Sequence, residues 1–148
     1  MKKDVIISIK GKQSYPQCPP EIIELVTEGV LEDRGDKGIT LSYQESEVTG
    51  LEGTLTTIQV EPRRVTLLRE GSVNSQMVFE EGRRHLSMYN TPYGALSVGI
   101  NTRKMRSSLS GTGGDVTIYY ALEIEHGQAG QNMFHIQVRQ TAQRAVSQ

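Results

Sequence analysis

The 148-residue sequence is 36% hydrophobic and 22% charged and has a formal net charge of −1 at pH 7. This composition excludes a disordered chain and a long apolar membrane-spanning segment, and the charge argues against a general nucleic-acid-binding protein. A chain of this length is typical of one domain. We therefore predict a single domain over residues 1–148, with no membrane span and no nucleic-acid partner.

Cysteine content indicates the compartment. The only cysteine, Cys18, rules out an internal disulfide and is typical of a reducing environment. The first apolar stretch, Val5 to Ile9, is interrupted by Ser8 and is too short for a signal-peptide core. We therefore predict a cytoplasmic protein.

Apolar residues alternate with polar ones along most of the chain, and this period of two predicts β-strands. The pattern is clearest at Val116, Ile118, Tyr120, Leu122 and Ile124, which we expect to face the interior. Between segments rich in Gly, Pro, Asn and Asp, it predicts about eight to ten strands. Their expected ranges are 3–11, 21–33, 38–48, 52–61, 64–71, 73–81, 84–91, 94–109, 115–126 and 131–140.

Short turns between consecutive strands predict an antiparallel up-and-down meander, because parallel pairing needs longer crossovers. A meander of this many strands closes into a barrel or folds into two sheets, since a long open sheet exposes its edges. We predict an all-β, closed antiparallel barrel, with a sandwich as the alternative. Gly29 and Gly99 fall within long strands and suit bends at barrel corners.

Several segments carry a family resemblance. They include Arg69-Glu-Gly71, Met77-Val-Phe79-Glu-Glu-Gly82 and Tyr89-Asn-Thr-Pro-Tyr-Gly94, followed by the alternating run from Leu96 to Thr102. From about residue 20 to 138 the chain resembles the YwiB-like family of bacterial proteins of unknown function. The resemblance implies a calycin-type barrel similar to lipocalins and fatty-acid-binding proteins. It implies no catalytic residues, and calycins often bind small apolar or amphiphilic ligands.

Within this stretch we predict that Thr91-Pro92-Tyr93-Gly94 forms a tight turn or strand corner. Pro92 restricts Thr91 to extended conformations, and Gly94 is able to take a positive φ.

Charge is distributed unevenly along the chain. Residues 1–61 contain six basic and eleven acidic residues, residues 62–106 contain eight and three, and residues 107–148 contain two and three. One interpretation is pairing between acidic early strands and basic middle strands. The other is a basic patch that meets an anionic ligand or partner, built from Arg63, Arg64, Arg83, Arg84, Arg103, Lys104 and Arg106.

No residue set indicates catalysis, a metal site or a cofactor. The Gly-rich segment from Gly111 to Asp115 precedes a predicted strand, so we interpret it as a hairpin turn and not as a phosphate loop. The histidines His85, His126 and His135 lack metal-binding spacing, and no serine lies in a nucleophile elbow. An enzyme is therefore the hypothesis we rank last.

The candidate ligand-binding residues are Arg69, Tyr43, Tyr89 and Tyr120. Arg69 shares its parity with Val65 and Leu67, so its guanidinium is expected to face the interior. There it either meets a ligand carboxylate or phosphate, or it reaches solvent or pairs with an internal acid or tyrosine. The tyrosines are either part of a ligand cage or core filler.

Two functions follow. The first is a barrel that holds a small anionic or amphiphilic molecule in its interior, and it requires a cavity of about 300 Å³ or more beside Arg69. The alternative is a structural or protein-interaction barrel with a core filled by its own side chains, for example a homodimer.

Overall fold

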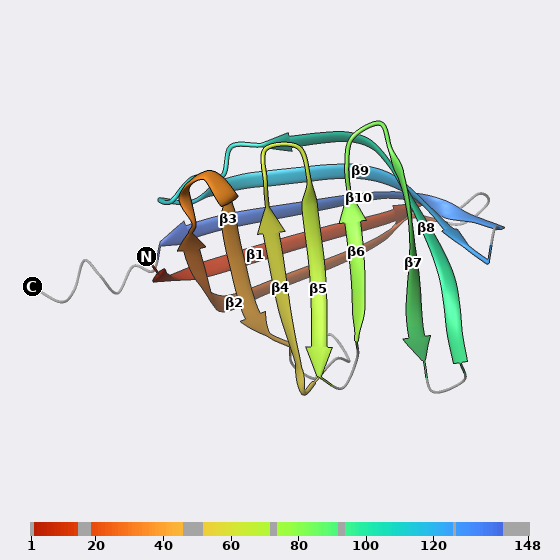
Figure 1. Ribbon diagram of the computed structural model, residues 1–148, viewed down its shortest axis with the longest axis horizontal. Coiled ribbons are helices and arrows are strands. Elements are labelled where there is room, and N and C mark those ends of the chain that lie inside the picture. Colours follow the sequence, from red (N-terminus) through yellow and green to blue (C-terminus); the bar gives the residue numbers. More distant parts are fainter. Residues whose placement is uncertain are drawn as a thin grey trace, which may run out of the picture.

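The computed structural model describes residues 2–14, 19–45, 52–71, 74–91, 94–125 and 127–140, with backbone only at 88–91 and 127–129. Ten strands and one short 3-10 helix make up this part of the chain (Figure 1). They are β1 (Lys2–Ser14), β2 (Glu21–Asp33), η1 (Gly35–Lys37), β3 (Ile39–Gln44), β4 (Thr54–Val60), β5 (Val65–Gly71), β6 (Ser75–Phe79), β7 (Arg84–Thr91), β8 (Gly94–Ser107), β9 (Gly114–Ile124) and β10 (Gly127–Gln140).

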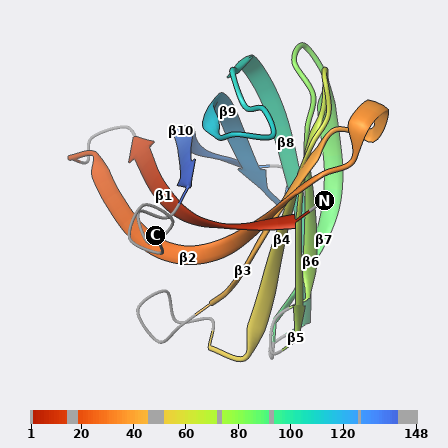
Figure 2. The same ribbon diagram turned by 90° about the vertical axis from the view of Figure 1, so that its left-hand side faces the viewer.

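All ten strands belong to one antiparallel sheet in the order β6-β5-β4-β3-β2-β1-β10-β9-β8-β7. Consecutive strands pair, and β1 pairs with β10, which confirms the predicted meander. The short strands β3 to β7 cross the long strands β1, β2 and β8 to β10 in Figure 1, and Figure 2 shows the sheet curving round on itself. The strand ranges agree with the predicted ones to within a few residues, except that β10 begins at Gly127.

The barrel is nearly closed. No ladder is recorded between β6 and β7, the two ends of the sheet, but these strands lie side by side. At this seam the Ser87 hydroxyl donates a hydrogen bond to the Gln76 carbonyl. Just beyond β6, the Gly82 amide donates to the Thr102 carbonyl at 2.9 Å. Side-chain and turn contacts therefore join the two edges in place of a continuous ladder.

The predicted register of β9 is confirmed. Val116 and Ile118 are buried, and Tyr120 and Leu122 pack against the core. Ile124 lies on the same face but is 40% exposed, because it is the last residue of the strand. The core consists mainly of β-branched and leucine side chains from the inner faces of the strands, and the described side chains of β7 contribute none of them.

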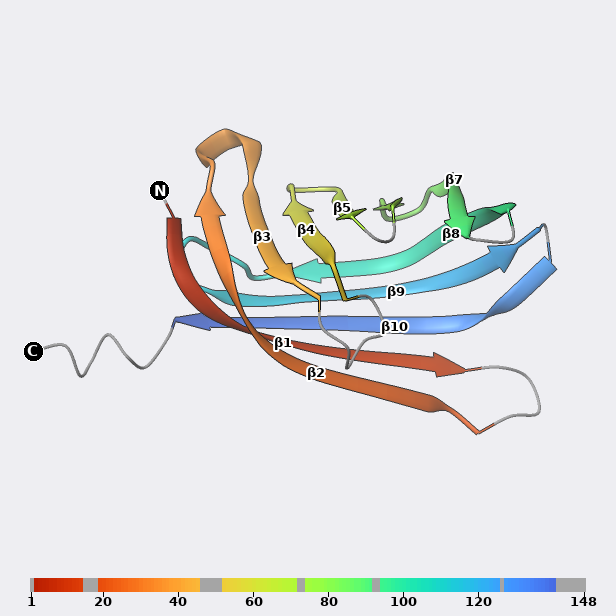
Figure 3. The ribbon, with the colours of Figure 1, turned by 90° about the horizontal axis from the view of Figure 1, so that it is seen from below.

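Gly29 lies where β2 changes its neighbours. Over Val30–Asp33 β2 pairs with β3, whereas Glu21–Gly29 pairs with β1 alone among the described residues. A Cβ at Gly29 would lie 2.6 Å from the Ser42 carbonyl oxygen and would also clash with Ile7. Gly29 therefore allows the close approach of β3, and Figure 3 shows β2 curving towards β3 at this end. Gly99 instead lies under the side chains of Arg84 and Glu123, where a Cβ would be 3.0 Å from the Glu123 carboxylate.

Candidate functional site

A row of four polar or amphipathic side chains crosses the interior from β3 to β6. The register aligns Tyr43 with Thr56, Thr56 with Arg69, and Arg69 with Ser75. Because directly paired residues point to the same face of a sheet, all four side chains project inward. Tyr43, Thr56 and Ser75 are buried and Arg69 is half-buried, so the row has a predominantly dry environment. We call these four residues the polar row.

An acidic residue lies on the β3 side of the polar row. The Glu45 carboxyl group is 1% exposed and accepts a hydrogen bond from the Thr56 hydroxyl. Its Oε2 atom is 3.9 Å from Nε of Arg69, so the two form an ion pair. Burial raises the pKa of Tyr43 strongly, and the negative charge of Glu45 raises it further. The Tyr43 hydroxyl therefore stays protonated and remains a donor at any physiological pH.

Of the buried side-chain groups that have no hydrogen-bond partner within the described part of the chain, two donors belong to the polar row. They are Nε of Arg69 and the Ser75 hydroxyl. The distance of 3.9 Å between Nε and Glu45 is too long for a hydrogen bond. A buried donor without an acceptor costs about 1–3 kcal/mol, so such groups are rare in folded proteins. These two donors can bind an oxygen atom supplied by a ligand or by water.

An apolar surface lies across the seam from these donors, on β8 and β9 beyond β7. Ser87, which bonds to Gln76 next to Ser75, pairs with Val98, and Val98 pairs with Ile124. On the same inner face, Leu96 lies two residues before Val98 on β8, and Leu122 lies two residues before Ile124 on β9. We call Leu96, Val98, Leu122 and Ile124 the inner wall. Leu96 is 37% exposed and Ile124 40% exposed, while Val98 and Leu122 are partly buried. The inner wall is therefore a hydrophobic surface that the protein itself does not fully cover.

The predicted site residues are only partly brought together. Arg69 and Tyr43 belong to the polar row, as described above. Tyr120 packs its ring edge against Phe79 at a centroid distance of 4.9 Å, and Phe79 is four residues along β6 from Ser75. The Tyr89 side chain lies outside the described residues. Of the predicted alternatives for Arg69, pairing with an internal acid is present, although the predicted residues did not include Glu45.

The two described cavities lie elsewhere, against the turns 61–64 and 80–83. The larger has a volume of about 440 Å³ and the smaller about 310 Å³, and neither is lined by Arg69. Arg63, Arg83 and Arg106 of the predicted basic patch line the larger cavity. Arg84 instead forms an ion pair with Glu123 on the outer face at 2.5 Å. The pairing predicted between the acidic early segment and the basic middle segment is present at Arg69 and Glu45, whereas the partner of Arg84 belongs to the C-terminal segment.

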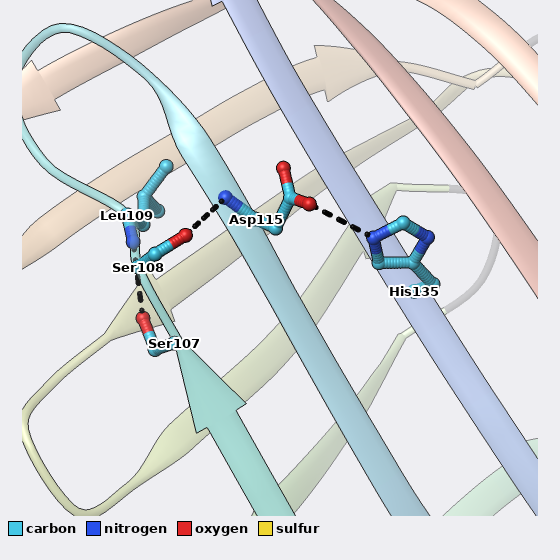
Figure 4. A network of polar contacts seen from close by, with 5 residues as sticks. All are labelled: Ser107, Ser108, Leu109, Asp115 and His135. Carbon is cyan, nitrogen blue, oxygen red and sulfur yellow. Dashed lines mark hydrogen bonds and ion pairs between the residues drawn. The ribbon is translucent and has the colours of Figure 1, made fainter.

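The histidines make simple pairwise contacts. His135 Nε2 lies 3.4 Å from Asp115 on the neighbouring strand, where Ser108 also accepts a hydrogen bond from the Asp115 amide (Figure 4). His85 lies 3.0 Å from Glu80. Within the described ranges, no three metal-binding side chains cluster together. His126 and Cys18 lie outside the described residues.

Both turn predictions can be checked in part. The segment 108–113 joins β8 to β9, and Ser110 pairs with Gly113, so the predicted hairpin is confirmed. Thr91 pairs with Gly94, which has a φ of 125°, as expected for a turn that requires glycine. Pro92 and Tyr93 lie outside the described residues. No helix among the described residues has the length and apolar character needed to cross a membrane.

Comparisons with known proteins agree with the predicted resemblance. A family model described as "Domain of unknown function (DUF1934)" matches residues 7–136. Among solved structures, the crystal structure of the YwiB protein from Bacillus subtilis is similar, with a TM-score of 0.83 and 21% sequence identity. The similarity covers 95% of this chain and 94% of that chain, and at this identity it shows the fold alone. A comparison with curated proteins finds no match.

Proposed function

The chain belongs to the DUF1934 family, whose description assigns no activity, and we propose that it is a cytoplasmic barrel that binds a small anionic amphiphile between the polar row and the inner wall. The observation that carries this proposal is the pair of buried, unused donors, Arg69 Nε and Ser75 Oγ, across the seam from an incompletely covered apolar surface. Small-molecule sites commonly combine an apolar lining with a few convergent polar groups.

The polar row gives the head group a defined place. Glu45 is held on the β3–β4 side of Arg69 through Thr56, whereas Ser75 lies on the β6 side. A ligand carboxylate or phosphate on the β6 side accepts from Arg69 and Ser75 while remaining separated from the Glu45 charge. Hydrogen bonds to charged groups contribute about 1.5–3 kcal/mol each, and these two bonds would make the site prefer an anionic head group to a neutral one.

The inner wall supports the apolar part of the ligand. When a ligand covers half-exposed leucine, valine and isoleucine side chains, the complex is stabilised by about 25 cal/mol for each Å² of apolar surface removed from water. Ile23 and Leu25 of β2 lie on the same inner face, and Ile23 is 52% exposed. An alkyl chain or ring therefore has apolar surface available beyond the four residues of the inner wall.

Isothermal titration calorimetry with dodecyl phosphate, dodecanoate and uncharged dodecanol tests this function. We expect the two anions to bind, and Arg69→Lys and Ser75→Ala each to weaken binding by about tenfold. Arg69→Lys retains a positive charge beside Glu45, so the fold keeps its ion pair. Ser8→Ala, on the outward-facing side of β1, is the matched control and should have no effect. The proposal is contradicted if dodecanol binds as tightly as the two anions, or if Ser8→Ala loses as much affinity for the anions as Arg69→Lys and Ser75→Ala.

One observation favours the alternative of a self-associating barrel. The β2 edge over Glu21–Gly29 has no strand partner on the side facing away from β1 within the described part of the chain, and it carries Ile22 and Val26, which are 53% and 65% exposed. Such an edge is able to pair with the same edge of a second copy. Light scattering after gel filtration separates the two functions: a dimer that Val26→Lys converts to a monomer supports self-association.

A further inference from the structure

The cavity of about 440 Å³ lies at the opposite end of the short strands from the polar row. It is bordered by the turn between β4 and β5, by the turn between β6 and β7, and by the last residues of β8. The polar row, in contrast, lies where β5 joins β6. A site here is therefore separate from the one proposed above, and its existence does not depend on that proposal.

Three arginines from three different elements line this cavity. They are Arg63 of the first turn, Arg83 of the second turn and Arg106 of β8. Arg64 lines the adjoining cavity of about 310 Å³, which shares Arg63 with the larger one. Within the ranges that the structure describes, no ion pair or hydrogen bond engages the guanidinium groups of Arg63, Arg64 or Arg106. Their charges are therefore available to an anion.

The acids of the cavity are mostly engaged with the protein. Glu80 contacts His85 at 3.0 Å and Arg83 at 3.8 Å. The hydrogen bond with His85, and to a lesser extent the charges of Arg83 and Arg64, lower the pKa of Glu80. Glu81 accepts a hydrogen bond from the Met105 amide at 2.7 Å. Only Glu61 faces the cavity without a described side-chain partner.

Backbone contacts fix the two turns. Glu61 and Arg64 exchange hydrogen bonds at 2.8 and 3.4 Å across the first turn. In the second turn, the Arg83 amide donates to the Glu80 carbonyl at 2.9 Å, and Gly82 is bonded to Thr102 of β8. The Cα positions that carry the arginines are thus set by the fold, and only the side chains have to be ordered when a ligand binds. This reduces the entropic cost of binding.

From these contacts we propose that the cavity binds a small molecule that carries a phosphate or diphosphate group. A guanidinium donates two parallel hydrogen bonds to phosphate oxygens, and several guanidinium groups suit an anion with more than one charge better than a single carboxylate. Val65, Met105 and Val116 give the cavity an apolar part. Its volume exceeds that of a phosphate group alone and lies within the range of small-molecule sites, so the ligand has a body that packs there.

Calorimetry with inorganic pyrophosphate as the probe tests this site at low salt. We expect wild type to bind, and Arg63→Gln and Arg106→Gln each to weaken binding by about tenfold. Glu61→Gln removes a repulsive charge and should tighten binding by about threefold. Arg103→Gln changes the same charge on β8 outside the cavity and should have no effect. These residues are exposed, except for the half-buried Glu61, so circular dichroism should confirm folding of all four variants.

Three results would overturn the assignment. They are the absence of any pyrophosphate binding, an equal loss of affinity in Arg103→Gln, and binding of a single-stranded oligonucleotide without binding of pyrophosphate. The variant Arg69→Lys, which tests the polar row, should leave pyrophosphate affinity unchanged. Failure of one site is therefore distinguishable from failure of the other.

Discussion

Arg69 pairs with Glu45 and is also part of the proposed binding site, so its contribution to stability has to be measured separately from binding. The substitution Arg69→Met retains the unbranched apolar part of the side chain and removes the charged guanidinium. It leaves the Glu45 carboxylate, which is 1% exposed, without its cation. Removing one partner of a buried ion pair costs about 3–5 kcal/mol. Because 22% of the Arg69 side chain reaches solvent, we expect the lower limit, about 3 kcal/mol.

The double variant Arg69→Met with Glu45→Gln provides the contrast. Replacing both members of a buried pair with neutral groups is often nearly neutral. We therefore expect the second substitution to recover about 2 kcal/mol of the loss, a coupling typical of residues in direct contact. For a chain of this size, about 3 kcal/mol corresponds to a decrease of about 10 °C in Tm.

Urea unfolding at pH 7, followed by circular dichroism, measures these free energies. Arg103→Met, an exposed arginine with no ion pair in the described part of the chain, is the control and should change stability by less than about 0.5 kcal/mol. If Arg69→Met costs no more than this control, or if its effect and that of Glu45→Gln are additive, the two residues are not coupled and the reasoning is refuted.

Three further predictions concern pH and backbone. The pKa of Tyr43 is raised in the folded protein, so the unfolded state loses this proton first as the pH rises. The free energy of unfolding should therefore fall above about pH 10. Measured by urea unfolding between pH 8 and 11, this fall should be smaller in Tyr43→Phe than in wild type. Gly38→Ala should cost about 3 kcal/mol because its φ is 94° and a Cβ would clash with the Val60 carbonyl; Gly35→Ala, with a positive φ but free space, should cost only about 1 kcal/mol in the same unfolding assay. His85→Ala should raise the pKa of Glu80 towards its ordinary value of 4.5, as followed by NMR titration; an unchanged pKa would exclude the His85 contact as its main cause.

Alternation of apolar residues was sufficient to predict the strands, their facing and the meander. It could not identify Glu45, which follows β3, or Ser75, which β6 contributes to the polar row. Glu45 shares its parity with Ile39, Leu41 and Tyr43, and Ser75 shares its parity with Phe79, so both could have been assigned to the interior. A charged residue near a strand end is equally compatible with solvent, however, and only the register of β4 and β5 places Thr56 and Arg69 beside them.

Partner strands and cavities depend on distances that a sequence does not contain. The length of β2 was predicted, but not that β3 pairs with only its last four residues. The basic middle segment was recognised as a possible patch, whereas its division between an ion pair at Arg84 and a cavity at Arg63, Arg83 and Arg106 follows from the turns that bring those residues together.

The most direct test of the proposed function is NMR titration of labelled protein with dodecyl phosphate below its micellar concentration. We expect saturable shifts at the Arg69 Nε–H resonance, at the Ser75 amide and at the methyl groups of the inner wall, while the control resonances of Ser8 and Arg103 stay unchanged. Shifts confined to Ile22 and Val26 on the β2 edge, or no saturable shift at Arg69, would contradict the proposed function.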